Sequence, residues 1–443
     1  MTSARNRELL ALVPVAALLT AGFAAVFSQE NEQLGNLSLI YGAYFLALCL
    51  ATHIFLRIRL PDADPYLFPL MATLTAFGLV MIYRIDEGLA RDQANWFVLG
   101  LVLFALTIQF LRDYEVLERY RYTIAIGGLL VLLAPRLPGI GQQVNGAYLG
   151  VKIGPLAFQP AEFTKLAIVV FLASYLREHR EVLIVGARRV LGVTLPPLKH
   201  FGPMLVVWGA SMFMLVFIRD LGSSLMFFAA FLALLYVATG RFSFVVIGMA
   251  MFLVGAWFFA STVPHVHERI DIWLHPYEDP QDSGYQILNS IFAQADGGLF
   301  GKGFGEALIT VPGGGPLLPA AQTDMIYALI VNEVGLFGAV GVVLVYMLIA
   351  ARGFKVALLA GDGFSKLLAT GLTAVFVIQA FVIIGGVTRV IPLTGVTLPF
   401  ISYGGSSIVA NFVLLALLLL VSDRARREAA EPAGRTPALG ATA

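Results

Sequence analysis

Long apolar runs, separated mostly by short polar connections, dominate this sequence. A helix needs ~20 apolar residues to cross a hydrocarbon core that is ~30 Å thick. Strands of a membrane barrel would alternate apolar and polar residues with period two, which these runs do not do. The sequence therefore predicts an all-α polytopic membrane protein with about twelve spans, at residues 9–27, 37–56, 66–83, 95–111, 122–135, 160–176, 201–218, 222–239, 243–262, 324–350, 367–388 and 398–421.

Composition and charge support this class and give it an orientation. Of the 443 residues, 58% are hydrophobic and only 13% are charged, whereas a soluble domain averages about 25% charged residues. With a cytoplasmic N-terminus, the cytoplasmic segments hold 20 of the 29 lysines and arginines and the outer segments hold 8. This bias predicts that both termini are cytoplasmic. A single cysteine, Cys49, excludes an intramolecular disulfide.

Two predicted outer connections, 136–159 and 263–323, are much longer than the rest. Long connections with little secondary structure are usually functional, so the chemistry is expected on the outer face. An ionisable group within a span costs ~2.5 kcal/mol or more unless it is paired or hydrated. Such groups gather at the outer ends of the predicted spans: Glu162 and Lys165 in "QPAEFTK", Arg219 and Asp220 in "IRDLGSS", Asp324 with Glu333 deeper on the same run, and Arg389 between the last two spans.

Each of these groups also has a structural interpretation. Glu162 and Lys165 could form a local ion pair at positions i and i+3, Arg219 and Asp220 could form a turn, and Asp324 could favour the helix dipole with Thr323 as N-cap. Together they lie on one face beside the two long connections. This gathering favours a polar cavity, open to the outside, that suits a lipid-linked substrate with an anionic head group.

Two other patterns are weak. "DGGLFGKGFG" lacks the Ser or Thr that follows the lysine of a phosphate-binding loop, no strand precedes it, and it faces outward. His265, His267 and His275 have spacing that is more typical of solvated or interfacial histidines than of metal ligands. We therefore predict no metal site from the residues.

Five blocks of the sequence resemble one family in order and spacing. They read "NGAYLGVKIGPLAFQPAEFTKLA", "IRDLGSSL", "SGYQILNSIFAQADGGLFGKGFGEA", "LPAAQTDMIYALIVNEVGLFG" and "IPLTGVTLPFISYGGSSIVANF". These blocks resemble the shape, elongation, division and sporulation (SEDS) family of membrane enzymes, which includes RodA and FtsW, over residues 64–425. The family is built on ten helices. The resemblance thus implies a glycosyltransferase core at 63–425, a two-helix extension at 1–62 as in some actinobacterial members, and a disordered cytoplasmic tail at 426–443.

The resemblance implies a reaction at the outer face of the cytoplasmic membrane. SEDS proteins polymerise glycan strands from lipid II, and undecaprenyl pyrophosphate leaves. The family's essential acid maps onto Asp324 in "QTDM", as general base, with Thr323 beside it. The block with Gln159 maps the family's Glu and Lys onto Glu162 and Lys165. From these we expect Lys165 to steady the pyrophosphate or to position Asp324, and Glu162 to hold Lys165.

This sequence departs from the family pattern at several positions. The first outer loop reads "NGAYLGV", with Leu149 in the part where a basic residue is common in the family, so Lys152 or Arg389 is expected to supply the missing cation. Gln322 replaces a common His before the Thr-Asp pair, and Asn332 replaces a common acid. Arg219 and Asp220 complete the expected substrate-binding set.

The resemblance also implies partners and an alternative. The expected partners are lipid II, membrane lipids and a class B penicillin-binding protein that supplies cross-linking; nucleic acid is not expected. No cofactor is evident, and dependence on a divalent cation stays open. "VPGGGPLLPAAQTD" is more similar to RodA than to FtsW, which favours a role in elongation. The main alternative is a lipid II flippase; a recruiting scaffold and another outer-face lipid-sugar enzyme, such as an O-antigen polymerase or ligase, are further alternatives.

Overall fold

The structure, a computed structural model, describes ten stretches of the chain. Most of the predicted span 201–218, Arg219 and residues 431–443 lie outside them. The described residues are 4–30, 36–144, 147–154, 156–185, 188–190, 193–195, 209, 220–262, 264–307 and 317–430.

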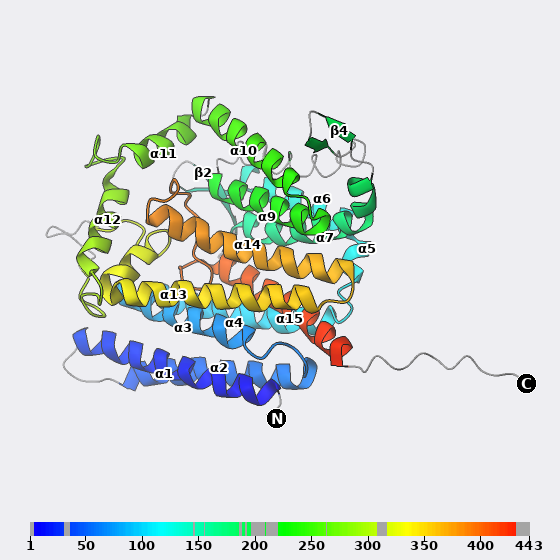
Figure 1. Cartoon of the computed structure of the whole chain (residues 1–443). Coiled ribbons are helices and arrows are strands. Elements are labelled where there is room, and N and C mark those ends of the chain that lie inside the picture. The colour runs from blue at the N-terminus through cyan, green and yellow to red at the C-terminus, as the bar shows by residue number, and fades with distance from the viewer. Residues whose placement is uncertain are drawn as a thin grey trace, which may run out of the picture.

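Helices make up most of the described chain (Figure 1). They are α1 (Ala4–Glu30), α2 (Asn36–Arg59), α3 (Leu67–Ile85), α4 (Glu87–Phe110), α5 (Val116–Arg119), α6 (Arg121–Leu133), η1 (Ala134–Arg136), α7 (Pro160–Val185), α9 (Leu221–Thr239), α10 (Phe242–Thr262), α11 (Pro264–Leu274), α12 (Tyr285–Gly297), α13 (Ile326–Leu359), α14 (Gly363–Val387) and α15 (Gly405–Ala430).

Eight of the described helices are long and apolar enough to cross a membrane: α1, α2, α3, α4, α9, α13, α14 and α15. The apolar part of α10 is shorter, Phe242–Phe258. The predicted spans at 122–135, 160–176 and 243–262 also contain helices, namely α6, α7 and α10. The chain is therefore mostly helical with several candidate membrane spans, as predicted, although it also contains short strands, and the described residues do not establish the predicted number of twelve spans.

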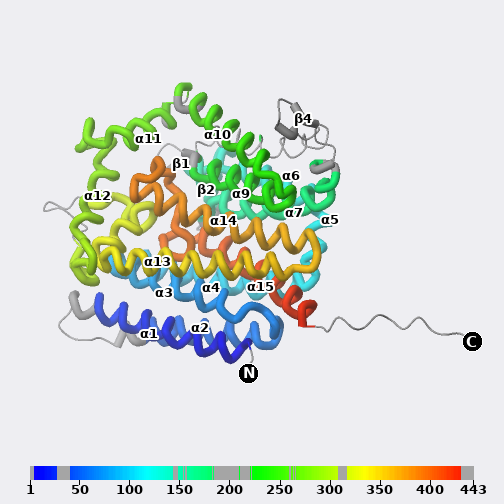
Figure 2. The backbone as a smooth tube through the Cα atoms, viewed as in Figure 1, coloured from blue at the N-terminus to red at the C-terminus, as the bar shows by residue number. Residues whose placement is uncertain are grey.

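The helices form a bundle in which α3, α4, α13, α14 and α15 lie side by side (Figure 1). Helices α1 and α2 cover one side of the bundle, α6, α7 and α9 form the other side, and α10 to α12 arch around one end (Figure 2). The core is centred on α15, where the Phe412 ring meets the rings of Phe97, Phe104 and Phe400 at centroid distances of 5.5, 6.3 and 5.1 Å. Such pairs add to the stabilisation from burial.

Aspartates start three of the helices. Asp86, Asp220 and Asp362 each stand at an N-cap, where the carboxylate accepts a hydrogen bond from the backbone amide three residues ahead at 2.8, 3.0 and 2.9 Å. An N-cap carboxylate satisfies one of the orphan amides of the first turn and favours the helix dipole. The charge of Asp220 thus has a local structural role as the N-cap of α9, which the sequence analysis did not predict.

Small antiparallel sheets occupy two connections. The predicted long connection 136–159 contains β1 (Gly141–Val144), β2 (Ala147–Ile153) and β3 (Leu156–Phe158), in the order β1-β2-β3 with a register shift between Gln142 and Gln143. The other sheet pairs β4 (Arg188–Val190) with β5 (Val193–Leu195). The first sheet leads directly into Pro160, the first residue of α7, where a fixed φ suits the first helical turn.

Helix α13 is broken near its beginning, which the single predicted span 324–350 did not include. Gly335 has φ 68° and ψ −174°. The glycine-rich stretch 297–303 fills the gap: the amide of Leu336 donates to the Gly298 carbonyl at 2.9 Å, and the amide of Gly303 donates to the Glu333 carbonyl at 3.0 Å. The backbone of "DGGLFGKGFG" therefore pairs with a helix break, which accounts for its glycines without a phosphate ligand.

The last span was predicted too early in the sequence. Residues 398–404 form turns and irregular backbone, and α15 runs from Gly405 to Ala430 instead of 398–421. The beginning of the predicted disordered tail, 426–430, is helical, and the remainder of the tail lies outside the described residues. The hydrophobic pattern did not locate the helix start because the segment ahead of it is also apolar and buried.

Buried polar contacts join the N-terminal helices to the bundle. Glu8 on α1 pairs with Arg5 and contacts His53 Nδ1 on α2 at 2.7 Å, and Arg5 donates to the Ala63 carbonyl just before α3. Arg352, near the C-terminal end of α13, lies 3.5 Å from Asp64. The predicted extension is therefore joined to the rest of the bundle by a buried polar cluster near the start of α1 as well as by apolar packing.

Candidate active site

Asp324 lies in a tight turn that immediately precedes α13. The Ala320 carbonyl accepts hydrogen bonds from the backbone amides of Thr323 and Met325 at 3.0 and 3.1 Å. Helix α13 begins at Ile326, with Met325 at its N-cap. Thr323 is therefore not the N-cap, contrary to the sequence-based expectation; it hydrogen-bonds Asp324 through its side chain.

Charged side chains from two other elements approach Asp324. The Cβ position at Gly395 is 3.7 Å from Asp324 Oδ2 and equally 3.7 Å from both terminal nitrogens of Arg269 on α11. Gly395 itself has φ 72°, a conformation that favours glycine. Asp220, at the start of α9, interacts electrostatically with both Asp324 and Arg269. Three ionisable groups from α9, α11 and the turn before α13 thus meet at one end of the bundle.

The surroundings raise the pKa of both carboxyl groups. Burial raises the pKa of Asp324 to about 6; Arg269 opposes this rise, Asp220 adds to it, and the hydrogen bond from Thr323 opposes it. Burial also raises the pKa of Asp220, while hydrogen bonds from Ser223 oppose the change. A carboxyl group with a pKa near the working pH can accept a proton and release it again, which is what general-base chemistry requires.

A segment that connects α14 to α15, residues 391–404, positions the turn of Asp324. Ser402 Oγ donates to the Thr323 carbonyl at 2.7 Å and accepts the amide of Leu398 at 2.9 Å. The Tyr403 amide donates to the Gln322 carbonyl at 2.8 Å. Two consecutive carbonyls just before Asp324 are therefore held by the 391–404 segment, the same segment that carries Gly395.

Glu162 and Lys165 form the predicted ion pair inside the bundle. Lys165 Nζ lies 2.5 Å from Glu162 Oε2, and both side chains are almost completely buried. Gln379 on α14 accepts from Lys165 at 2.7 Å and donates to the other Glu162 oxygen at 3.2 Å. Asn411 on α15 accepts from Lys165 at 3.3 Å. A buried pair of this kind needs such additional hydrogen bonds to offset desolvation.

These contacts limit what Lys165 can do. An ammonium group has three donors, and three protein oxygens already accept from this one. A ligand anion could bind Lys165 only by displacing one of them. Gln379 donates to the Thr397 carbonyl at 3.0 Å, so Lys165 is linked through Gln379 to the 391–404 segment and hence to the Asp324 turn. The geometry fits the expected positioning role of Lys165 better than pyrophosphate binding.

The remaining candidate residues are more scattered. The backbone amide of Gln159 donates to Ser406 Oγ of α15 at 2.7 Å, which ties the end of the first sheet to the start of α15. Lys152 is exposed on β2, and its backbone amide donates to the Ile140 carbonyl at 2.8 Å. No contact recorded among the described residues joins Lys152 to Asp324. Arg219 lies outside the described residues.

Arg389 binds protein carbonyls. It has φ 61° just after α14, and its Nε and Nη2 donate to the carbonyls of Trp273 and Leu274, at the end of α11, at 2.8 and 3.0 Å. The expectation that Arg389 supplies a cation for pyrophosphate finds no support in this geometry. The guanidinium satisfies orphan carbonyls at a helix C-terminus, where a positive charge is favourable.

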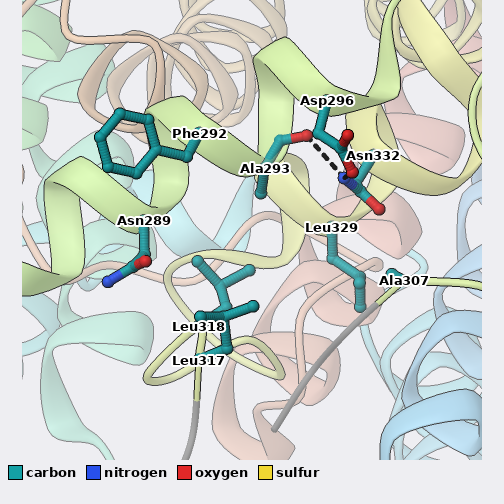
Figure 3. A pocket seen from close by; sticks show the side chains of 9 residues that line it. All are labelled: Asn289, Phe292, Ala293, Asp296, Ala307, Leu317, Leu318, Leu329 and Asn332. Atoms are coloured by element: carbon teal, nitrogen blue, oxygen red, sulfur yellow. Dashed lines mark hydrogen bonds between the residues drawn. The ribbon is translucent and has the colours of Figure 1, made fainter. Parts of the chain in front are cut away.

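A cavity of about 290 Å³ opens between α12 and α13 (Figure 3). Asn332 lies in its wall and donates to the Ala293 carbonyl at 2.7 Å and to Asp296 at 3.4 Å. An ionised acid at position 332 could not donate these bonds, which gives the departure from the family pattern a structural reason. Lys302 also pairs with Asp296, at 2.8 Å.

Nothing in the described part of the chain gathers three or more His, Cys, Asp or Glu side chains as metal ligands. The side chain of His265 lies outside the described side chains, and His275 is 3.8 Å from Glu278.

Sequence reasoning did not select several residues that the structure brings to the site. Arg269 was counted only as one of the outer charges, although it stands in the segment "PHVHERIDIWL", where charged and apolar residues alternate as on an amphipathic helix. Gln379 and Asn411 are single polar residues within apolar runs, which is a usable signal because buried polar side chains in spans require partners. Gly395 and Ser402 lie in the block "IPLTGVTLPFISYGGSSIVANF", which supported the family resemblance but from which no site residue was selected.

The curated proteins most useful for comparison are from mycobacteria. Peptidoglycan glycosyltransferase RodA of Mycobacterium tuberculosis is 39% identical over 434 residues, which span 96% of this chain and 91% of that protein. The protein of the same name from Mycobacterium leprae is 37% identical over 433 residues, which span 95% and 91%. An FtsW relative from Geobacter metallireducens is 31% identical over 382 residues, which span 83% and 97%. This chain is thus more similar to the RodA relatives than to that FtsW relative.

Solved structures share the fold. One is a chain from a peptidoglycan synthase complex in which polymerization and crosslinking are structurally coordinated; it matches with a TM-score of 0.66 at 28% identity, over 82% of this chain and 98% of that chain. The Rod shape determining protein RodA of Thermus thermophilus matches with a TM-score of 0.58 at 25% identity, over 82% and 97%. A family model described as a cell cycle protein, for FtsW, RodA and SpoVE, matches residues 65–427. Since that match covers most of the chain, the protein belongs to the FtsW/RodA/SpoVE family and is RodA-like.

Proposed function

We propose that this protein is a peptidoglycan glycosyltransferase that polymerises lipid II into glycan strands during cell elongation. The observation that carries the proposal is Asp324, a half-buried carboxyl group with a pKa raised to about 6, which lies at the end of a span beside Arg269 and Asp220. This position suits a substrate whose sugar lies at the membrane surface while its lipid remains in the bilayer. The family membership and the names of the relatives support the same activity.

In the proposed reaction, the 4-hydroxyl oxygen of one disaccharide attacks the anomeric carbon of a second, lipid-linked disaccharide. The carbon–oxygen bond to the pyrophosphate breaks, and its electron pair leaves with undecaprenyl pyrophosphate. Asp324, ionised, accepts the proton of the attacking hydroxyl. A positioned general base typically contributes ~10²–10⁴-fold in rate. Lys165 acts through Gln379 and the 391–404 segment as a positioning residue, and Glu162 holds Lys165.

The proposed topology has twelve spans in the cytoplasmic membrane, with both termini in the cytoplasm and the site on the outer face. The excess of lysine and arginine in the connections opposite the site supports this orientation. Helix α15 starts beside the site and ends at Ala430, where the basic residues Arg424, Arg426 and Arg427 gather. Residues 1–62 would then contribute two spans beyond the ten of the family core.

A class B penicillin-binding protein is the proposed partner for cross-linking. The solved chain from a complex that coordinates polymerization with crosslinking supports this choice, because it matches most of this chain. The reaction as proposed has no step that needs a cofactor, and dependence on a divalent cation is to be measured.

The test is a polymerisation assay with the purified chain and lipid II, with and without the partner and with and without EDTA. Glycan length is measured on a gel, and the Asp324→Asn variant is the matched control. We expect glycan strands from the wild type and at least ~10²-fold less from the variant. If the wild type moved lipid II across vesicle membranes but made no strands, the protein would be a flippase and the proposal would fail.

A further inference from the structure

The 391–404 segment carries two buried hydroxyl groups that have no hydrogen-bond partner. Among the described side chains, Thr394 and Thr397 are the only ones with such a hydroxyl. Buried threonines on the helices donate to the carbonyl four residues earlier, as Thr75 and Thr370 do at 2.9 and 2.8 Å. A buried hydroxyl without a partner lowers stability, so one that is present in a folded protein requires an explanation.

The backbone around these hydroxyls is, by contrast, supplied with partners. The Leu393 carbonyl accepts a hydrogen bond from Arg269 Nη1 at 2.7 Å. The Thr397 carbonyl accepts one from Gln379 Nε2 at 3.0 Å. Because the backbone is held on both sides of Thr394, loose packing of the segment does not explain its unpartnered hydroxyl.

Thr394 lies between two elements of the site. It precedes Gly395, whose Cβ position is 3.7 Å from Asp324 Oδ2. Consecutive Cα atoms are 3.8 Å apart, so the Thr394 Cα is within roughly 9 Å of that oxygen. The Cβ and the carbonyl oxygen of Thr394 are each 3.2 Å from the Cβ position at Gly222, in the first turn of α9, the helix that Asp220 caps. Thr394 therefore joins the start of α9 to the surroundings of Asp324.

Thr397 has different surroundings. Its Cγ2 is 3.1 Å from the Cβ position at Gly404, just before α15, and its carbonyl binds Gln379. Thr397 thus belongs to the contacts that link Lys165 to the Asp324 turn, whereas Thr394 is the unpartnered hydroxyl beside Asp324 itself.

A neutral hydroxyl offers the site a kind of contact that its carboxylates do not. A threonine hydroxyl donates one hydrogen bond and accepts up to two, whereas an ionised carboxylate only accepts. In the proposed reaction the substrate presents an anionic diphosphate and sugars with neutral hydroxyl and amide groups. An uncharged group that both donates and accepts suits the sugars and has no charge with which to hold the diphosphate.

The Thr394 hydroxyl can reach a ligand by a change of rotamer. Its Oγ1 is covered in the structure, whereas the residue as a whole is half-buried. Rotation about χ1 from one staggered rotamer to another moves the hydroxyl to a different position. A ligand that supplies a partner there would give the hydroxyl a hydrogen bond that the free protein lacks.

Resting on the function proposed above, we infer that the Thr394 hydroxyl binds a neutral hydroxyl or amide group of the lipid-linked sugar beside Asp324. Thr394 is then a substrate-binding residue that recognises the sugar and not the diphosphate. Its hydroxyl has no partner in the free protein because that partner arrives with the substrate.

The test compares two ligands that share the diphosphate and differ in the sugar. Lipid II carries the disaccharide and undecaprenyl pyrophosphate does not. Binding of each is measured by native mass spectrometry in an Asp324→Asn background, where turnover is suppressed. We expect Thr394→Val, which keeps the shape of the side chain, to weaken lipid II binding by ~5-fold or more and to leave undecaprenyl pyrophosphate binding unchanged. Thr394→Ser keeps the hydroxyl and should bind both ligands as the parent variant does.

The stability of the free protein is an independent readout. Because the unpartnered hydroxyl destabilises the free protein, Thr394→Val should unfold at a higher temperature than the wild type. Thr370→Val is the matched control, since Thr370 is buried near the start of α14, away from the 391–404 segment, and its hydroxyl already has a partner. We expect this control to unfold no higher than the wild type and to bind both ligands unchanged.

Two results would overturn the inference. If Thr394→Val weakened the binding of both ligands equally, or of neither, its hydroxyl would not recognise the sugar. Thr394→Ala gives the same comparison should the valine variant not fold. Polymerisation by the wild type is measured separately: glycan strands leave the proposed function standing even if the ligand comparison fails, whereas their absence would sink the proposed function whatever the binding data showed.

Discussion

Trp273 and Arg389 exchange hydrogen bonds where the end of α11 meets the end of α14. The indole of Trp273 donates to the Arg389 carbonyl at 3.1 Å, and the Arg389 guanidinium donates to the Trp273 carbonyl at 2.8 Å. Because Arg389 adopts φ 61°, its backbone is held in a region that non-glycine residues rarely occupy. The pair therefore costs some backbone strain and fixes α11, which carries Arg269, against the end of α14.

This reciprocal contact leads to a double-mutant prediction. We expect Arg389→Gln and Trp273→Phe each to reduce the polymerisation rate several-fold, because each removes hydrogen bonds that hold α11 against the end of α14. The double variant should be hardly worse than either single variant, because residues that act through one contact are not additive. Polymerisation of lipid II by the four proteins, at equal amounts of folded protein, measures the coupling.

A contrary result has a definite meaning. If Arg389→Gln abolished activity while Trp273→Phe had no effect, Arg389 would act directly on the anion, as the sequence led us to expect. Arg389→Lys is the matched variant, because it keeps the charge but cannot donate to two carbonyls in the same fork geometry.

Sequence reasoning located the acidic residue and the buried pair because ionisable residues are rare in membrane spans and are easily recognised there. Asp324, Glu162 and Lys165 are charges next to apolar runs, where they are expensive unless they have partners or a function. Their neighbours were harder to find. Arg269 comes from a connection whose path across the bundle end depends on tertiary packing, and no periodicity in the sequence indicates which carboxyl group it meets.

Helix boundaries were least predictable where apolar residues continue through a turn. Residues 398–404 were included in the predicted span 398–421, so the contacts of Ser402 and Tyr403 with the Asp324 turn were hidden within that span. Gly335 was likewise included within a single span, because a glycine is tolerated in a helical pattern and only the paired backbone at 298–303 shows that the helix is broken there.

The Glu162–Lys165 pair should behave as a unit. Lys165→Met leaves the Glu162 carboxylate buried without its cation, and breaking a buried pair costs ~3–5 kcal/mol, more than replacing both partners. We expect Glu162→Gln with Lys165→Met to be more thermostable in detergent than Lys165→Met alone, with both variants inactive. Thermal unfolding and lipid II polymerisation are measured on the same preparations. Activity in the double variant would show that the pair serves folding only.

Asp324 should give the polymerisation rate a defined pH dependence. The general base must be ionised, and its pKa is raised to about 6. The rate should therefore be close to its plateau above pH 7, fall to half near pH 6, and drop about tenfold for each further pH unit. Asp324→Asn should lack this limb because its residual activity no longer depends on a carboxylate. A half-maximal rate near pH 4 would mean that burial does not shift the pKa of Asp324.

The same raised pKa makes a separate prediction about stability. A carboxyl group whose folded-state pKa exceeds its unfolded value of ~3.9 binds its proton more tightly in the folded state. Folding is therefore favoured at low pH by this group, and that contribution is lost as the pH rises from about 4 to about 6. At pH 7.5 we expect Asp324→Asn to unfold a few degrees above the wild type, with a smaller difference at pH 4.5. Equal unfolding temperatures at both pH values would contradict this.

Gly335 should be intolerant of a side chain. Its φ of 68° disfavours other residues, and a Cβ would collide with the backbone of Leu299 and Gly301. Because both neighbours are backbone atoms, the clash cannot be relieved by a side-chain rotation, and we expect Gly335→Ala to lower the unfolding temperature markedly. Gly341→Ala is the control, since that position is on the same helix and has open space. Similar stability of the two variants would show that the break in α13 can be closed without cost.

The N-terminal helices should affect stability without affecting the chemistry. Glu8 is fully buried and contacts Arg5 and His53, so Glu8→Ala leaves a buried arginine without its carboxylate. We expect this variant to lose ~3–5 kcal/mol of stability. Arg57→Ala is the control, because the hydrogen bond of Arg57 to Asn6, at 3.2 Å, is exposed.

Activity per folded molecule should be unchanged in Glu8→Ala. The cluster around Arg5 lies beside Asp64, which is 3.5 Å from Arg352 near the end of α13, whereas Asp324 precedes the beginning of that helix. At 1.5 Å per residue, the helix separates the two places by roughly 40 Å. The measurement is the polymerisation rate divided by the folded fraction at a temperature where both proteins are mainly folded. A lower rate per folded molecule would mean that the two additional helices influence the site through α13, and that the extension does more than cover one side of the bundle.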